Sequence, residues 1–256
     1  VFDVVTPDEL KEKLKSEGKD VPEIEGGKPQ QVVVPKTDRV ARFIEQVILP
    51  ALEWFDALQG KDRRTYSYIP VVANGVARAA ALDLRLVLPG AADDPGSKVN
   101  VCVRNVLQIA KEKPEETQVI FCDRMNPVKA NAITSGARAV MEMVEDTGEE
   151  EEEDMFLFRD MTRKLIAGGI PAEQIAVIND YNTDARRATL FDRFNRGEVR
   201  VLIGSTQKMG TGVNIQARLY AAHHLDAPYM PSELEQRNGR IVRAENRNRV
   251  VKVLYY

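Results

Sequence analysis

The chain has 256 residues, a formal net charge of −3, and hydrophobic and charged fractions of 43% and 29%. These values are typical of one or two globular domains, and the longest apolar runs are far too short to cross a membrane. No secretory signal is visible, so we expect a cytoplasmic protein. The chain begins with Val1 rather than a methionine, so we expect it to be a piece of a longer protein.

The charge is unevenly distributed, and its overall sign is a poor guide to partners. Acidic residues concentrate in "EDTGEEEEED" (145–154), which is typical of a solvated loop. Arginines concentrate in "QRNGRIVRAENRNRVVK" (236–252). A slightly negative chain therefore still has a local patch that suits a polyanion such as nucleic acid.

Residues 1–95 predict a mostly helical extension. Helical patterns occupy 6–18, 37–60 and 75–88, and Pro50 is expected to kink the second of them. Between the first two helices, a Gly- and Pro-rich connector leads into a short apolar strand at 31–34.

Residues 96–256 predict a second domain of α/β class. Short apolar runs alternate with amphipathic helices, which is typical of a buried parallel sheet with helices on both faces. The expected strands are 118–123, 175–180, 199–205, 219–226 and 250–256. The expected helices lie near 98–113, 126–145, 155–168, 184–196 and 232–243. The segment 126–154 is long for one connection, so we interpret it as an insertion.

The loop after the strand at 199–205 has the sequence "GSTQKMGTGVNIQ" (204–216). Thr206 and Lys208 offer a hydroxyl and a cation, and Gly210 and Gly212 leave backbone N–H groups accessible. Such a loop can hold a sugar-phosphate backbone without reading bases. A plain turn, in which the glycines only permit positive φ, explains the residues equally well.

The segment "EQRNGRIVR" (235–243) places arginines at intervals of three. On a helix Arg237, Arg240 and Arg243 would share one face, where guanidinium groups pair well with phosphate oxygens. An ordinary solvated basic helix is the alternative. Gly239 is costly within a helix and suggests the close approach of another backbone or a ligand.

Together, these two segments resemble motifs of superfamily-2 helicases and translocases. "LIGSTQKMGTGVNIQ" looks like motif V, "EQRNGRIVR" like motif VI (Q-R-x-G-R-x-x-R), and "QVIFCDR" like motif IV. "HLDAPYMPSELEQ" is similar to the link between motifs V and VI in Swi/Snf-type translocases. The resemblance covers 98–256 strongly and 30–95 weakly. It is greatest to phage, plasmid and bacterial helicases linked to adenine-specific DNA methyltransferases.

The resemblance implies a RecA-like parallel sheet and a role for each matching residue. Arg240 and Arg243 would be catalytic arginine fingers that reach the γ-phosphate of ATP. Residues on the nucleotide side would be Gln236, Asn214 and Gly239. Residues on the nucleic-acid side would be Thr206, Lys208, Gly210, Gly212 and Arg237.

The resemblance also implies partners that this sequence does not contain. No G-x-x-x-x-G-K-[ST] phosphate loop is present, and each Gly-Lys pair is followed by Asp or Pro. ATP with Mg²⁺ would therefore be bound mainly by an absent first RecA-like domain of the same full-length chain. DNA would be contacted through its backbone, without regard to sequence, and a fused or associated DNA methyltransferase is a further expected partner. The fragment alone is expected to be inactive.

Other readings remain open. Ala244-Glu245-Asn246 stands where Swi/Snf-type chains usually carry a Gly-Gln pair, which leaves the finer class undecided. The main alternative is a non-catalytic nucleic-acid-binding module with a degenerate helicase fold. Half of a nucleotide-sugar transferase is a weaker one, because arginine helices also bind diphosphates.

We expect no metal site. Cys102 and Cys122 are isolated and fit buried reduced thiols. His223 and His224 are adjacent in a predicted strand, so their rings would point to opposite faces and could not easily share one ion.

Overall fold

A computed structural model describes residues 21–256 of the chain, except for 89, 125, 127–155, 211–212 and 229. The chain divides into two compact units, which are described separately. The first, here called the sheet unit, comprises Val1–Val33, Cys102–Asp123 and Asp160–Tyr256. The second, here called the helical unit, comprises Val34–Val101 and Arg124–Arg159.

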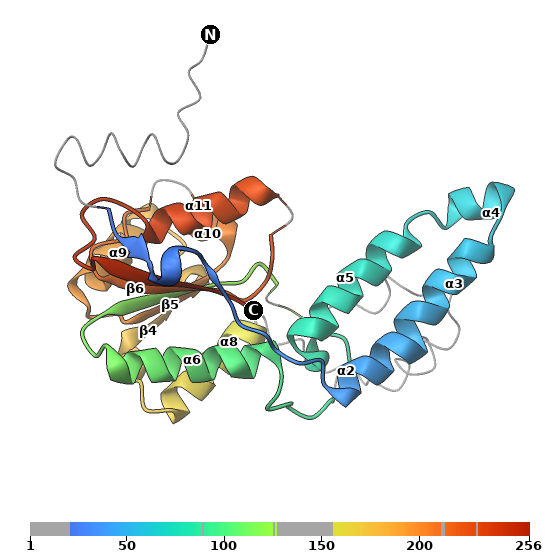
Figure 1. The fold of residues 1–256 in the computed structure, drawn as a ribbon, viewed down its shortest axis with the longest axis horizontal. Coiled ribbons are helices and arrows are strands. Elements are labelled where there is room, and N and C mark those ends of the chain that lie inside the picture. The colour runs from blue at the N-terminus through green and yellow to red at the C-terminus, as the bar shows by residue number, and fades with distance from the viewer. Residues whose placement is uncertain (1–20, 89, 125, 127–155, 211–212, 229) are drawn as a thin grey trace, which may run out of the picture. The chain divides into compact units, whose positions relative to one another are not determined.

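The described part of the sheet unit contains one parallel sheet of seven strands (Figure 1). The strands lie in the order β1-β7-β6-β3-β5-β4, and β2 also pairs with β7. Their bounds are β1 (Glu23–Ile24), β2 (Gln30–Gln31), β3 (Thr117–Phe121), β4 (Ile175–Val177), β5 (Val201–Gly204), β6 (Leu219–His224) and β7 (Val250–Tyr255). This confirms the predicted α/β class with a RecA-like parallel sheet.

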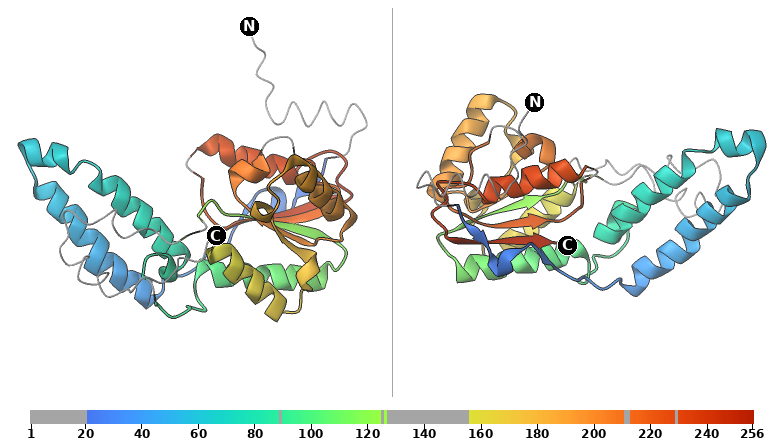
Figure 2. Two further views of the ribbon diagram at one scale, coloured as in Figure 1. Left: turned by 180° about the vertical axis from the view of Figure 1, so that it is seen from behind. Right: turned by 45° about the horizontal axis from the view of Figure 1, so that its top comes forward.

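Helices cover both faces of this sheet. On one face lie α6 (Lys98–Glu112) and α8 (Phe156–Ala167), and on the other lie α9 (Asp184–Arg196), α10 (Thr206–Gly210) and α11 (Pro231–Ile241) (Figures 1 and 2). Every residue of β3, β5 and β6 is buried as a result. The strands are nearly continuous apolar runs because helices bury their side chains on both faces of the sheet.

The sheet is wider than the sequence predicts, because part of the expected extension joins it. β1 and β2 both run parallel to β7, and the backbone N–H of Val32 donates to the carbonyl of Tyr255 at 2.7 Å. Gly26 and Gly27 lie between the two strands with φ of 72° and 75°, a conformation that favours glycine. The edge strand is thus interrupted, and each piece is too short to show the alternating pattern of a strand.

Helix α9 shows how local sequence sets an element's bounds. The hydroxyl of Thr183 accepts the N–H of Arg186 at the start, and Gly197 ends the helix with φ of 82°. The buried Leu190 and Phe194 hold α9 against the sheet. The predicted bounds, 184–196, are those observed.

The two adjacent histidines of β6 are buried on opposite sides of the strand, as predicted. The ring of His223 contacts the Tyr256 hydroxyl at 2.8 Å and Gln118 Oε1 at 3.0 Å. The ring of His224 stacks on Phe121 instead. Burial lowers the pKa of both imidazoles from 6.5 to about 3, so both are neutral in the fold.

The helical unit contains two long helical arms joined by a short helix (Figure 2). The first arm is α2 (Asp38–Phe43), a π-helical turn (Ile44–Ile48) and α3 (Leu49–Ala57), the short helix is α4 (Gly60–Thr65), and the second arm is α5 (Ile69–Leu82). The predicted irregularity near Pro50 is present as the π-helical turn just before it, where the N–H of Leu49 donates to the carbonyl of Ile44. A 3-10 turn (Leu84–Leu86) follows α5, so the predicted helix at 75–88 ends early.

Two predicted segments lie outside the described residues. They are the first helix, at 6–18, and nearly all of the insertion at 126–154 with its acidic end.

The buried histidines predict acid sensitivity in a defined pH window. As the pH falls below 6.5, both imidazoles bind protons in the unfolded chain, whereas in the folded chain they stay neutral until about pH 3. Stability should therefore be fully present above pH 6.5. It should decline on acidification by at most about 1.4 kcal/mol per pH unit for each histidine. Urea unfolding at pH 7.5, 6.0 and 5.0 measures this decline.

The matched control is the double variant His223→Gln, His224→Phe, which has no imidazole at these positions. The control should lose most of the slope between pH 6.5 and 5.0. A parent chain whose stability is flat across that window would contradict the buried neutral state of both rings.

Candidate phosphate and nucleic-acid site

The candidate site lies where the carboxyl ends of three neighbouring parallel strands meet. β3 lies between β5 and β6, so residues that follow these strands are close in space. Asp123 follows β3, Thr206 opens α10 just after β5, and Asp226 follows β6. Ligands of open parallel sheets bind at this edge.

Arg237 of α11 joins these three strand ends. Its Nη2 donates to Asp123 Oδ2 at 2.7 Å and to Asp226 Oδ1 at 3.1 Å. Its Nη1 donates to the carbonyl of Asp226, and its Nε donates to Thr206 Oγ1, both at 2.8 Å. The guanidinium also lies over the ring of Phe121, 5.4 Å from its centroid. The residue is only 1% exposed, so these contacts form a buried hub.

Asp123 completes the hub by fixing the start of α10. Its two carboxylate oxygens accept the backbone N–H of Thr206 at 2.6 Å and the Thr206 hydroxyl at 2.8 Å. The backbone N–H of Asp123 donates in turn to Asp226 Oδ2 at 2.7 Å. A carboxylate at a helix N-terminus is favourable, because it accepts N–H groups that have no partner within the helix. Asp123, Asp226, Thr206 and Arg237 are therefore interlocked.

The hub changes how the predicted nucleic-acid residues are understood. Thr206 is buried, and its hydroxyl and N–H both bond Asp123. A phosphate contact by Arg237 would require its guanidinium to leave two carboxylates. Lys208 is exposed, Gly210 is the last residue of α10, and Gly212 lies outside the described residues. Contact of these residues with nucleic acid stays a prediction.

Arg240 and Arg243 converge on a single backbone oxygen. Arg240 Nη1 donates to the carbonyl of Val213 at 3.1 Å, and Arg243 Nη1 donates to the same carbonyl at 3.3 Å. Helix α11 ends at Ile241, so Arg243 lies beyond it and the expectation of one shared helix face was wrong. The two side chains nevertheless meet, because the chain turns after the helix.

The charges of these two arginines are not neutralised within the described part of the chain. Neither guanidinium forms an ion pair there, and the buried Nε of Arg240 has no hydrogen-bond partner there. Burial, and then repulsion from Arg243, lower the pKa of Arg240. Two adjacent cations that share one neutral acceptor make a site that an anion would stabilise.

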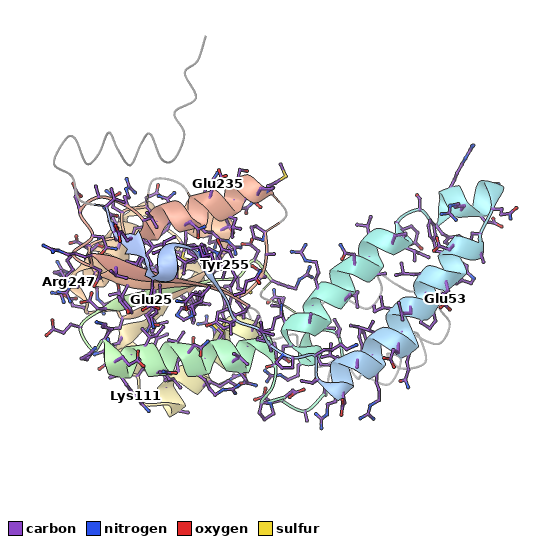
Figure 3. All side chains as sticks on the ribbon, in the orientation of Figure 1. Glu25, Glu53, Lys111, Glu235, Arg247 and Tyr255 are labelled. Atoms are coloured by element: carbon purple, nitrogen blue, oxygen red, sulfur yellow. The ribbon has the colours of Figure 1, made fainter. Side chains whose placement is uncertain are left out.

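The predicted nucleotide-side residues lie near this pair on exposed positions. Gln236 and Gly239 are exposed on α11, as is Glu235 on its outer side (Figure 3). A β-carbon at Gly239 would meet no described atom within 4 Å, so the expected close approach of another backbone is not found within the described part of the chain. The side chain of Asn214 is exposed, while its carbonyl accepts Asn195 Nδ2 at 2.8 Å.

The hub around Arg237 was not predicted from the sequence. Asp123 and Asp226 each follow a predicted strand, so the sequence places both at the edge of the sheet where ligands bind, but it does not reveal that they share Arg237, which was assigned to nucleic acid. Asn195, which holds the backbone of the loop that follows α10, was not predicted either. The available signal was an acidic residue at the end of each of two neighbouring strands, with an arginine helix after the second.

No metal centre or membrane span is found in the described ranges. They contain no group of three or more His, Cys, Asp or Glu side chains that could hold a metal ion. Asp123 and Asp226, which do lie close together, are both paired with Arg237. None of the helices in these ranges is long and apolar enough to cross a bilayer.

The hub predicts a large stability effect from a single buried arginine. Arg237→Met keeps much of the side-chain volume but removes the cation from Asp226, whose side chain is 10% exposed, and from Asp123, whose side chain is 38% exposed. The free energy of unfolding should fall by about 3 kcal/mol, the low end of the range for a broken buried ion pair, because solvent screens the exposed part of Asp123. Chemical denaturation measures it.

Arg196→Ala is the matched control, because Arg196 forms ion pairs with Asp192 and Glu198 on an exposed surface. It should leave the denaturation midpoint nearly unchanged. Equal, small effects of both substitutions would show that the hub does not hold the strand ends together.

Comparisons with known proteins place this geometry in a family context. Residues 137–245 match the family model described as the helicase conserved C-terminal domain. No curated protein matches the chain in sequence. The crystal structure of the C-terminal part of the Fun30 ATPase domain superimposes with a TM-score of 0.55 at 13% identity, covering 92% of this chain and 85% of that one.

Two longer proteins match over smaller shares. The DUF1998 helicase MrfA bound to DNA has a TM-score of 0.38 at 14% identity, covering 60% of this chain and 17% of that one. Dbp5 of S. cerevisiae, bound to RNA and ADP BeF3, has a TM-score of 0.37 at 17% identity, covering 64% of this chain and 33% of that one. This chain therefore corresponds to no more than a third of either of these proteins. The parallel sheet therefore has the RecA-like fold, and residues 137–245 are similar to the helicase conserved C-terminal domain.

Proposed function

We propose that this chain is the second motor domain of an ATP-dependent DNA helicase or translocase. In this role it supplies Arg240 and Arg243 to a nucleotide held mainly by a first RecA-like domain. It also supplies the loop after β5 to the backbone of a nucleic acid. The helicase C-terminal domain is the coarse basis of the proposal, and the site geometry supports the finer assignment.

The observation that carries the proposal is that Arg240 and Arg243 lie together without a carboxylate partner. Arg237 bonds two carboxylates, whereas Arg240 and Arg243 share only the Val213 carbonyl. Placing two guanidinium groups side by side without a carboxylate costs free energy through repulsion and desolvation. A phosphate group approaching from outside the chain would remove that cost. This is the behaviour expected of arginines that stabilise charge during phosphoryl transfer.

The chain suits half of a nucleotide site rather than a whole one. ATP, when bound, supplies the phosphoryl group and brings Mg²⁺. The described residues offer cations for its phosphates but no cluster of metal ligands. The sequence also lacks the lysine of a phosphate loop. Mg²⁺ and the remaining phosphate contacts are therefore assigned to the first motor domain.

The nucleic-acid side is proposed at the loop after β5. Lys208 is exposed there, and the sequence places Gly210 and Gly212 in the same loop. Thr206 and Arg237 are proposed to hold the start of this loop in place, because their polar groups bond one another and Asp123 in the hub. We expect DNA rather than RNA, because the sequence resembles Swi/Snf-like motors linked to adenine-specific DNA methyltransferases. A fused or associated methyltransferase remains a proposed partner on the same ground.

The alternative is a non-catalytic nucleic-acid-binding module that has lost ATP use. Such a module would have no use for the cation pair, which destabilises the folded chain unless an anion joins it. The simplest way to remove this cost would be an Asp or Glu beside Arg240. No described carboxylate pairs with Arg240. This observation favours the motor domain over the alternative.

The first test is Arg240→Ala in the longer motor that contains both RecA-like domains. Turnover of ATP should fall about a thousandfold or more, the usual effect of losing an arginine finger. Nucleic-acid binding should stay within about twofold of the parent, because Arg240 lies on the proposed nucleotide side. Steady-state ATPase assays and fluorescence anisotropy measure the two effects.

The control for this test is again Arg196→Ala, on the exposed surface of α9, which should keep parental turnover. Parental turnover in Arg240→Ala would contradict the proposed function. Loss of turnover in both variants would point to a folding defect instead.

The second test concerns how nucleic acid is held. Contacts to backbone phosphates predict affinity that falls linearly on a log–log plot against salt and does not depend on base sequence. Lys208→Ala should reduce that slope by about one unit for every sequence tested. Anisotropy titrations of the motor with two unrelated DNA sequences at several salt concentrations measure the slope. A sequence-dependent slope, or one unchanged by Lys208→Ala, would contradict backbone contact at this loop.

A further inference from the structure

Asn195 holds the loop that carries the acceptor of the cation pair. It lies in the last turn of α9, one residue before Arg196, which ends the helix. Its Nδ2 donates to the carbonyl of Asn214 at 2.8 Å, and its Oδ1 accepts the N–H of Ala217 at 3.2 Å. Both ends of the amide are used, and each faces a backbone group of the opposite kind. The orientation of the side chain is therefore set by the backbone that it holds.

The held loop, residues 213–217, is otherwise fixed by burial. Val213, Ile215 and Gln216 are buried, and the carbonyl of Ala217 accepts the backbone N–H of Arg247 at 3.0 Å. Polar backbone groups of this loop thus have partners on three separate segments: α9, α11 with the turn after it, and the chain that leads into β7. Each such hydrogen bond contributes about 1 kcal/mol.

The contacts of Asn195 and of the two arginines are mechanically linked. The arginines bond the Val213 carbonyl, and Asn195 bonds the next carbonyl along the chain, that of Asn214. Peptide groups are planar, so only the two backbone torsions of Asn214 separate these carbonyls. Fixing one of them restricts the direction in which the other can point.

Resting on the proposed function, we propose that Asn195 is a positioning residue that couples the nucleotide side of the motor to its nucleic-acid side. Its amide sets the loop 213–217 so that the Val213 carbonyl holds Arg240 and Arg243 at rest. When the arginines move to a phosphate, their hydrogen bonds to this carbonyl break. The hydrogen bonds of Asn195 then limit how far the loop can shift. Helix α10, on the proposed nucleic-acid side, ends at Gly210, three residues before Val213. The loop 213–217 and the proposed nucleic-acid side are therefore close together in the sequence.

Two substitutions of Asn195 in the full motor separate hydrogen bonding from packing. Asn195→Ala removes both bonds. Asn195→Asp keeps the side-chain volume and the acceptor for Ala217, but it cannot donate to the Asn214 carbonyl when ionised. Asp192→Ala is the matched control on the same helix, because its exposed carboxylate pairs only with Arg196 among the described ion pairs.

We expect both Asn195 variants to hydrolyse ATP without DNA within about twofold of the parent, and their KM for ATP should change little. Stimulation of turnover by DNA should fall at least about fivefold in both, the lower end of typical coupling between sites. Asp192→Ala should keep parental stimulation. A role in packing alone would leave Asn195→Asp like the parent, which would overturn the inference, as would equal losses in Asp192→Ala.

Arg240→Ala, measured alongside, distinguishes failure of this inference from failure of the proposed function. If Arg240→Ala loses turnover while both Asn195 variants keep parental stimulation, the coupling role of Asn195 is wrong and the motor assignment stands. If Arg240→Ala keeps turnover, the motor assignment itself is wrong. Thermal melting of each variant checks folding, and Asn195→Asp carries the test if Asn195→Ala does not fold.

Discussion

The buried guanidinium of Arg237 is the contact on which the rest of the site depends. It bonds Asp123, Thr206 and Asp226, which follow three neighbouring strands, and it belongs to helix α11. A buried cation between two carboxylates is costly to separate, so the helix cannot shift without breaking a strong set of bonds. The position of α11 relative to the sheet therefore fixes the direction in which the later arginines leave it.

The chain uses arginines of one short segment for two different purposes. Arg237 points into the hub and is neutralised, whereas Arg240 and Arg243 point to the loop after β5 and are not. The contrast matters more than the number of basic residues, because only unpaired cations favour an anion from outside. The loop that receives them is held from its other side by Asn195. Both arginines and Asn195 thus bond neighbouring carbonyl groups of one loop.

Much of the fold could be predicted from local patterns, but the site could be predicted only in part. Helix α9 has its cap, its apolar face and its final glycine within the helix and its two flanking residues, so its bounds were predicted. β1 and β2 are two residues each and take their stability from β7, more than 200 positions later. The apolar run at 31–34 marks the region of β2 only in part, and no local signal marks β1. The hub was missed for the same reason, since Arg237 and Asp123 are 114 positions apart. The pairing of Arg240 with Arg243 was expected from helical spacing, yet it arises from the turn beyond the helix.

The central claim is that Arg240 and Arg243 rest on the Val213 carbonyl until a phosphate replaces it. A structure of the full motor with nucleic acid, ADP and beryllium fluoride tests this most directly, because the fluoride stands in for the γ-phosphate. The account predicts guanidinium nitrogens of both arginines within about 3 Å of the fluoride, with their bonds to Val213 broken. Both arginines still bonded to Val213, with the fluoride held entirely by other groups, would contradict it.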